Sequence, residues 1–211
     1  MSSGDVERWL PFFEPFFASL AEARSFIEPL EALSLGDPRH QAKIMMHQTQ
    51  RLVSLSDDLP KIRKGNEGLR LLFLLICAEH IAKLANKYGG EGESRAYVRK
   101  FFSWFLSADQ QRQLCAGVAQ HDRRPSSLRQ AVDALYDVRC DVVHEGKYWG
   151  FHFHDGDTPM LNQEPDVVVS LTLQEFRSLI VSGCIHAIQR YPQKPQPVVP
   201  AGAAASRRLR R

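Results

Sequence analysis

The sequence has no hydrophobic run long enough to cross a bilayer. Its longest apolar run, from Leu71 to Ala78, is far short of the roughly 20 residues that a membrane-spanning helix needs. The start of the chain also lacks the cationic segment followed by an apolar one that is typical of a secretory signal peptide. We therefore expect a cytoplasmic protein with no membrane partner.

Cysteine is scarce, and its spacing matches no common motif. The four cysteines, Cys77, Cys115, Cys140 and Cys184, form no Cys-x-x-Cys pair. In a chain without a secretory signal, this pattern predicts free thiols rather than disulfides. Cys77 and Cys184 lie in apolar helical stretches, which predicts that they are small core residues.

Basic charge is concentrated at one end of the chain. The formal net charge is +3, but the segment 192–211 contains five lysines and arginines and no acid. Removing these five charges leaves −2 for residues 1–191, so net charge does not predict a broad surface for nucleic acid. We expect segment 192–211 to be disordered. It is either a basic arm for phosphates or, as we favour, a solvated tail without a partner.

Several motifs that would indicate a reaction are missing as well. The sequence has no glycine-rich phosphate loop, no Gly-x-Ser-x-Gly and no His-Glu-x-x-His. What the chain does have is 211 residues with 44% hydrophobic content, which is enough to fill one core.

Helical periodicity dominates the sequence. It predicts helices over residues 6–33, 39–58, 69–88, 93–106, 108–119, 128–143 or 144, and 173–191, with the first bent near Pro11 or Pro15 and the second ending before Pro60. The pattern changes between 148 and 171. There an alternating aromatic segment (148–154), a turn and a β-branched segment (166–171) predict a short β-hairpin. We thus expect a mainly α helical bundle with a β-hairpin insertion before the last helix.

One arginine stands where apolar residues are expected. On a wheel of about 100° per residue, the helix from Leu128 places Arg139 in the middle of its apolar stripe. A guanidinium there is unfavourable unless it is paired or reaches a wet cleft. Arg139 either extends to solvent at the last turn, or is presented into a groove or a dimer interface to hold a phosphate.

His144 follows Arg139 by five positions, which places it about 140° away on a regular helix. The two side chains therefore do not share a face of one continuous helix. They can converge if the helix ends or tightens at Val143, before the stop at Gly146, or if a site combines residues from two subunits. Alone, His144 is equally typical of a helix end.

The string from Leu135 to Lys147, with Arg139 and His144 inside it, resembles the Arg-x(4–6)-His motif of the HEPN superfamily, and most of all its Apea-like branch. The resemblance covers roughly residues 69–190 in architecture. With the pattern of helices and the composition of the tail, we expect an N-terminal helical segment (1–60), a HEPN-like helical domain (61–191) with the hairpin near 148–171, and the tail (192–211).

The resemblance further implies a metal-independent endoribonuclease that acts as a homodimer and needs no cofactor, in a stress, toxin or defence role with an antitoxin or other regulatory partner. Arg139 and His144 would be catalytic, because histidine titrates near neutral pH and arginine binds phosphate oxygens in a fork. Cys140, Asp141 and Glu79 would support them. The sequence departs from the motif at Cys140, where active members usually have a small polar residue, so a non-catalytic module for dimerisation or for binding RNA or another ligand remains the alternative.

A second set of residues competes with this motif. His152 and His154 alternate on the expected strand, with Asp155 and Asp157 close behind, and such a group can bind zinc or another transition metal. No further histidine or cysteine completes the ligand set, so we favour a structural hairpin and expect no metal.

Overall fold

A computed structural model describes residues 3–62, 64, 66–120, 125, 127–147, 151–155, 167–195 and 197. The chain is mainly helical, with one two-stranded antiparallel sheet whose second strand precedes the last helix. The expected fold class is confirmed. Among the described residues, no helix is both long and apolar enough to cross a membrane. Most of segment 192–211 lies outside the described residues.

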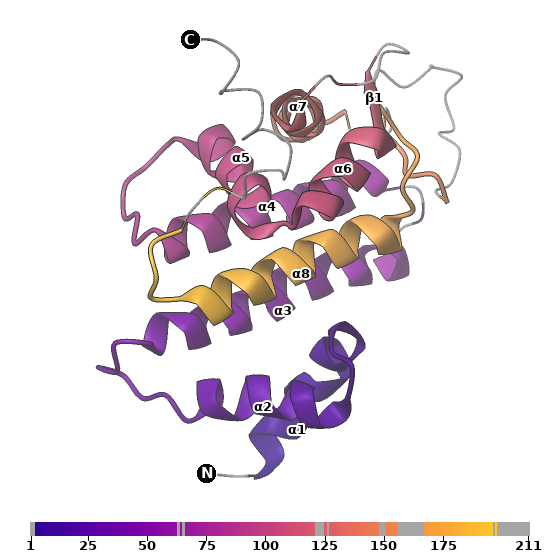
Figure 1. The fold of residues 1–211 in the computed structure, drawn as a ribbon. Coiled ribbons are helices and arrows are strands. Elements are labelled where there is room, and N and C mark those ends of the chain that lie inside the picture. Colours follow the sequence, from indigo (N-terminus) through magenta and orange to yellow (C-terminus); the bar gives the residue numbers. More distant parts are fainter. Residues whose placement is uncertain are drawn as a thin grey trace, which may run out of the picture.

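The first two helices form a layer of their own at one end of the molecule (Figure 1). Helix α1 (Ser3–Phe13) leads through a short 3-10 turn, η1 (Glu14–Phe16), into α2 (Leu20–Glu31). The expected single bent helix is therefore two helices packed against each other. The break follows Pro15, and Ser19 then starts α2 by accepting the backbone N–H of Glu22 at 3.2 Å.

Helix α3 (His40–Ile62) runs past Pro60, where we had expected it to end. Proline cannot donate the backbone hydrogen bond to the carbonyl four residues earlier, which belongs to Ser56. The Nε of Arg70 donates to that carbonyl instead, at 3.2 Å. The Ser56 hydroxyl in turn donates to the carbonyl of Arg70 at 3.1 Å. This exchange satisfies the carbonyl that Pro60 leaves free, so the helix can continue.

The body of the molecule lies above this first layer. Its helices are α3, α4 (Glu67–Ala85), α5 (Ser94–Phe105), α6 (Ala108–Gly117), α7 (Leu128–Glu145) and α8 (Leu173–Arg190). Helices α3 and α8 lie side by side, and α4 packs against α3, α5, α7 and α8. Figure 1 shows α5, α6 and α7 on the side of the body away from α1 and α2.

The small sheet pairs segments far apart in the sequence. Strand β1 (Val118–Gln120) follows α6 directly and pairs antiparallel with β2 (Val167–Val169). The expected pairing of 148–154 with 166–171 as an antiparallel hairpin is wrong, because β2 takes its partner from the end of α6. In segment 151–155, Phe153 makes only an isolated parallel bridge to Val169. Residues 148–150 and 156–166 lie outside the description.

Candidate functional site

Helix α7 carries the Arg-x4-His motif on a continuous helical backbone. Its first turn is capped by Ser127, whose hydroxyl accepts the N–H of Gln130 at 3.3 Å. Its end is at Gly146, which adopts φ of 68°, a left-handed conformation that glycine takes without steric cost. Because the helix continues through Glu145, it does not end or tighten at Val143. The early helix end that would bring Arg139 and His144 together within one chain is therefore not present.

Arg139 lies half-buried beside an aromatic ring. Its guanidinium carbon is 5.1 Å from the centroid of Tyr136, one turn earlier on α7. The guanidinium of Arg95, on α5, lies 4.7 Å from the same ring. A cation over an aromatic face is stabilised by the ring quadrupole. This contact explains how Arg139 tolerates its place on the apolar stripe without a carboxylate partner among the described residues.

Two arginines near Arg139 form ion pairs with acids of α7. Arg95 binds the carboxylate of Asp137, and Arg99 binds both oxygens of Asp133 at 2.6 and 2.8 Å. In the part of the chain that the structure describes, Arg139 forms no ion pair. Its donors are thus available to an anionic ligand, because a cation–π contact uses the face of the guanidinium rather than its N–H groups.

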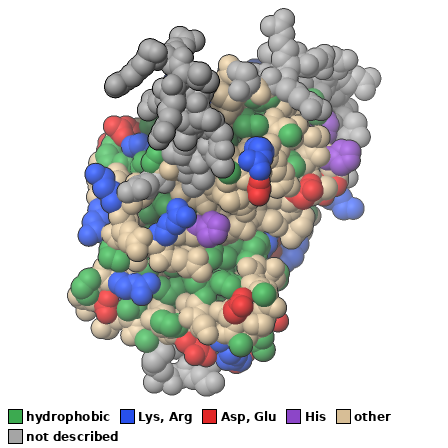
Figure 2. Space-filling model, in the orientation of Figure 1, with side chains coloured by type: hydrophobic (Ala, Val, Ile, Leu, Met, Phe, Trp, Pro, Cys, Tyr) green, Lys and Arg blue, Asp and Glu red, His purple; other side chains and the backbone are tan. Residues whose placement is uncertain are grey.

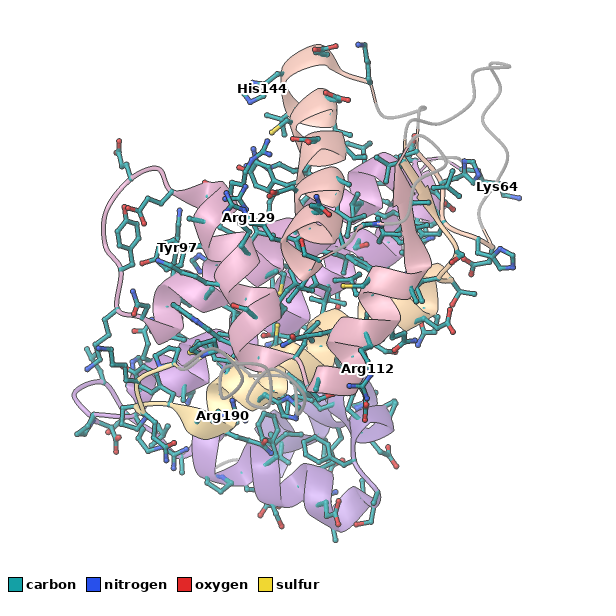
Figure 3. The ribbon with its side chains drawn as sticks, turned by 45° about the horizontal axis from the view of Figure 1, so that its top comes forward. Lys64, Tyr97, Arg112, Arg129, His144 and Arg190 are labelled. Carbon is teal, nitrogen blue, oxygen red and sulfur yellow. The ribbon has the colours of Figure 1, made fainter. Side chains whose placement is uncertain are left out.

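His144 lies in the last turn of α7 and is exposed. Figure 3 shows it at the free end of the helix, pointing outward, while Arg129 lies at the other end of α7. Cys140, one turn before His144, is half-buried against the core. This exposure leaves the His144 imidazole accessible to a ligand that approaches from solvent. It stands about 140° around the helix from Arg139, so one chain alone does not join the two side chains.

The other residues expected to support the motif have separate roles. Glu79 is half-buried on α4, where its carboxylate binds Lys83 at 2.7 Å, one turn later on the same helix. The backbone carbonyl of Asp141 accepts the N–H groups of Gly146 and Lys147, so this residue closes the end of α7. Neither observation brings Glu79 or the Asp141 carboxylate to the Arg139 guanidinium.

The histidines before the last helix do not form a metal site among the described residues. His154 is exposed, and Asp155 uses its Oδ1 to accept the N–H of Leu173 at 2.8 Å, at the start of α8. His152 is half-buried, and its buried Nδ1 has no hydrogen-bond partner among the residues that the structure describes. Within the described ranges, no group of three or more potential ligands is close enough to hold a metal ion. Asp157 lies outside those ranges.

One buried acid was missed in the sequence. Glu67, in the first turn of α4, is 8% exposed, and its Oε2 accepts the N–H of Phe153 at 2.6 Å. Burial raises the pKa of this carboxyl, while the hydrogen bond from Phe153 and the charge of Arg70 oppose the rise. No sequence signal marks Glu67, because its partner is distant along the chain.

Comparison of the chain with protein-family models, with curated proteins and with solved structures found no match. The geometry above and the sequence motif are therefore the basis for assigning a function.

Proposed function

We propose that the protein is a metal-independent endoribonuclease that acts as a homodimer, with Arg139 and His144 as its catalytic residues. The observation that supports the proposal is the half-buried guanidinium of Arg139, which lies over Tyr136 and forms no ion pair among the described residues. An arginine held in this way offers its donors to a phosphate.

The reaction follows from the chemistry of the two side chains. His144 accepts the proton of a ribose 2′-hydroxyl, and the 2′-oxygen attacks the adjacent phosphorus. The bond from phosphorus to the 5′-oxygen breaks, and the proton passes from the imidazole to that oxygen. Arg139 binds the phosphate oxygens, whose charge increases in the transition state. The products are a 2′,3′-cyclic phosphate and a free 5′-hydroxyl, and DNA is not cleaved because it has no 2′-hydroxyl.

A second copy of the chain completes the site in this proposal, because one α7 directs Arg139 and His144 to different sides. Helix α4 offers an apolar surface for such a partner. Four of its hydrophobic residues lie on one stripe and remain half-buried rather than buried: Leu69, Leu72, Phe73 and Ile76. A stress, toxin or defence role, with an antitoxin or other regulatory partner, belongs to the same proposal.

Incubation of the purified protein with single-stranded RNA in EDTA tests the activity. We expect cleavage that is lost in Arg139→Ala and in His144→Ala. Arg129→Ala is the matched control, because Arg129 lies on the same helix and its side chain is 74% exposed; this variant should cleave normally. Undiminished cleavage by both motif variants would overturn the assignment.

Mixing the two inactive variants tests whether the site is shared. If Arg139 of one subunit works with His144 of the other, a mixed dimer has one intact site. Random exchange of subunits should then restore roughly a quarter of the wild-type rate. If no activity returns although mixed dimers form, the site does not combine the two chains.

A non-catalytic module is the second candidate, and Cys140 favours it. This residue follows Arg139 directly, and a thiol is only a weak hydrogen-bond donor. In that case the wild-type protein never cleaves RNA, while Arg139→Ala weakens dimerisation or the binding of an anionic ligand. Sedimentation analysis of the wild type and of this variant, beside the cleavage assay, separates the two candidates.

A further inference from the structure

A groove of about 440 Å³ lies between α2 and the last turn of α8, on different elements from Arg139 and His144. Figure 2 shows hydrophobic side chains in a band between the layer of α1 and α2 and the body above it. The volume falls within the range of about 300–1,000 Å³ that is typical of small-molecule sites.

The base of the groove is apolar. Phe26 and Leu30 of α2 and Ile188 of α8 are buried residues that line it. Phe17 lies beside them, with its ring centroid 5.2 Å from that of Phe26. These side chains offer a surface that an aliphatic or aromatic group can cover, and burying such a group away from water is favourable.

The rim of the groove carries one available positive charge. Arg39, directly before α3, is exposed, and its guanidinium forms no ion pair within the described part of the chain. Asp37 is close in sequence, but its carboxylate accepts the backbone N–H of Arg39, at 2.7 Å. Glu22 also lines the rim, and its carboxylate accepts the N–H of Ala18, at 3.1 Å, at the start of α2. The positive end of that helix offsets the charge of Glu22.

We propose that this groove binds a small amphipathic carboxylate, with its apolar body against Phe26, Leu30 and Ile188 and its carboxylate on Arg39. The guanidinium fork matches a carboxylate in charge and shape. Ser25 and Gln189, also on the rim, supply neutral polar groups at the mouth. We expect the ligand to be a single small carboxylic acid that is not part of a larger molecule, because the groove has room for only one such molecule.

Calorimetric titration of the full-length protein with decanoate, below its micellar concentration, tests the proposal, and decanol serves as the uncharged probe. We expect saturable binding of one decanoate per chain. Arg39→Ala should weaken decanoate binding about tenfold and leave decanol binding unchanged, because only the acid uses the guanidinium. Ser25→Trp, at an exposed rim position, should block both probes by filling the groove.

The matched control is Arg51→Ala, which removes an exposed arginine of α3 that does not line the groove. It should bind both probes as the wild type does. The absence of saturable decanoate binding would overturn the proposal, as would binding that neither Arg39→Ala nor Ser25→Trp changes. RNA cleavage plays no part in this measurement, so the two proposals can fail separately.

Discussion

At the scale of single residues, Glu67 shows how burial couples a side chain to pH. Its carboxylate is enclosed near Phe153, His152 and Arg70, and burial raises its pKa above the ordinary value of 4.5. Because the pKa of Glu67 is higher in the folded state than in the unfolded state, there is a range of pH in which the folded protein keeps the carboxyl proton and the unfolded chain has released it. The resulting stabilisation is complete below pH 4.5 and is lost as the pH rises through the raised pKa.

Glu67→Gln should remove this dependence, because the amide is neutral at every pH and its oxygen can still accept the N–H of Phe153. We expect the variant to gain in unfolding free energy relative to the wild type as the pH rises from 4.5 towards 7. The gain is about 1.4 kcal/mol for each unit by which the pKa is raised. Urea denaturation at several pH values measures it.

Glu175→Gln is a control of opposite sign. The backbone N–H of Thr172 donates to the Glu175 carboxylate and lowers its pKa. Its stabilisation is therefore present above the ordinary pKa and is lost as the pH falls through the lowered one. This variant should be less stable than the wild type near neutral pH and should approach it in acid. A gain for Glu67→Gln that does not grow with pH would contradict the account of Glu67.

The buried cysteines give a second prediction at this scale. Cys77 and Cys184 are fully buried with their sulfur atoms 3.7 Å apart, and the contact with Cys184, together with burial, raises the pKa of Cys77 well above its ordinary value. Thiolates rather than thiols react with alkylating reagents. Iodoacetamide should therefore label both only after global unfolding, while the half-buried Cys140 reacts in the native protein. Mass spectrometry of timed samples reads this order, and early labelling of Cys77 would contradict it.

At the scale of elements, local signals were sufficient for most helices. Ser127 and Thr172 cap α7 and α8, and each side chain accepts the backbone N–H of the residue three positions later. The end of α7 at Gly146 was also anticipated. The continuation of α3 past Pro60 was not, because Arg70, which takes over the free carbonyl of Ser56, lies on another helix.

The strand pairing was wrong for a related reason. Val118–Gln120 is too short to show alternation, and its residues continue the apparent periodicity of α6. Antiparallel pairing depends on which backbone edges meet in the fold, and the sequence near β2 does not contain that information. A local hairpin was the simplest interpretation of two adjacent β-prone segments. In the structure β2 instead pairs with β1, which directly follows α6, and the paired residues Gln120 and Val167 are 47 positions apart in the sequence.

Gly183 tests the close packing of α8 on α5. A Cβ at this position would lie 2.7 Å from Cζ of Phe101 and 3.2 Å from a methyl carbon of Leu106. Both neighbours are fully buried, so neither side chain can move away freely. Gly183→Ala should lower the unfolding free energy by about 1–3 kcal/mol through overpacking, although alanine is the better helix former.

Gly89→Ala is the matched substitution, since a Cβ there meets no atom within 4 Å. It should change stability by less than about 0.5 kcal/mol. Urea unfolding curves of the two variants and the wild type measure both effects. Equal midpoints for Gly183→Ala and the wild type would mean that α8 can shift away from α5.

At the scale of the whole molecule, the candidate site depends on contacts between elements that the sequence does not reveal. The motif itself was visible, and so was the unusual position of Arg139. The role of Tyr136 as its support, and the pairing of Arg95 and Arg99 with acids of α7, arise only when α5 packs beside that helix. These pairings leave Arg139 as a cation without a carboxylate among the described residues of this face.

Arg177 links three parts of the fold. From α8, its Nε donates to both carboxylate oxygens of Asp57 on α3, at 3.1 and 3.0 Å. Its guanidinium also lies 5.1 Å from the ring centroid of Phe12 in α1 and 5.9 Å from that of Phe16 in η1. Only 15% of the side chain is exposed, so these contacts are only partly screened by water. The Arg177 side chain therefore contacts both the first layer and the body and stabilises their packing.

Arg177→Met should keep the packing of the stem while removing the charge. We expect a loss of about 2 kcal/mol in unfolding free energy, because the charge of Asp57 is left unpaired and the cation–π contacts are lost. Hydrogen exchange should also accelerate in α1 and η1 more than in α4, since the first layer loses its attachment while the centre of the body does not. Amide exchange followed by mass spectrometry resolves these segments.

Asp57→Asn separates the two contributions of Arg177. It removes the ion pair but leaves the guanidinium over Phe12 and Phe16, so it should lower global stability while protection in α1 stays close to that of the wild type. If Arg177→Met accelerated exchange equally in all helices, the Arg177 side chain would contribute to the stability of the body but would not attach α1 and η1 to it. The first layer would then be held by its apolar contacts, among them Phe13 and Phe26, whose ring centroids lie 5.5 Å apart.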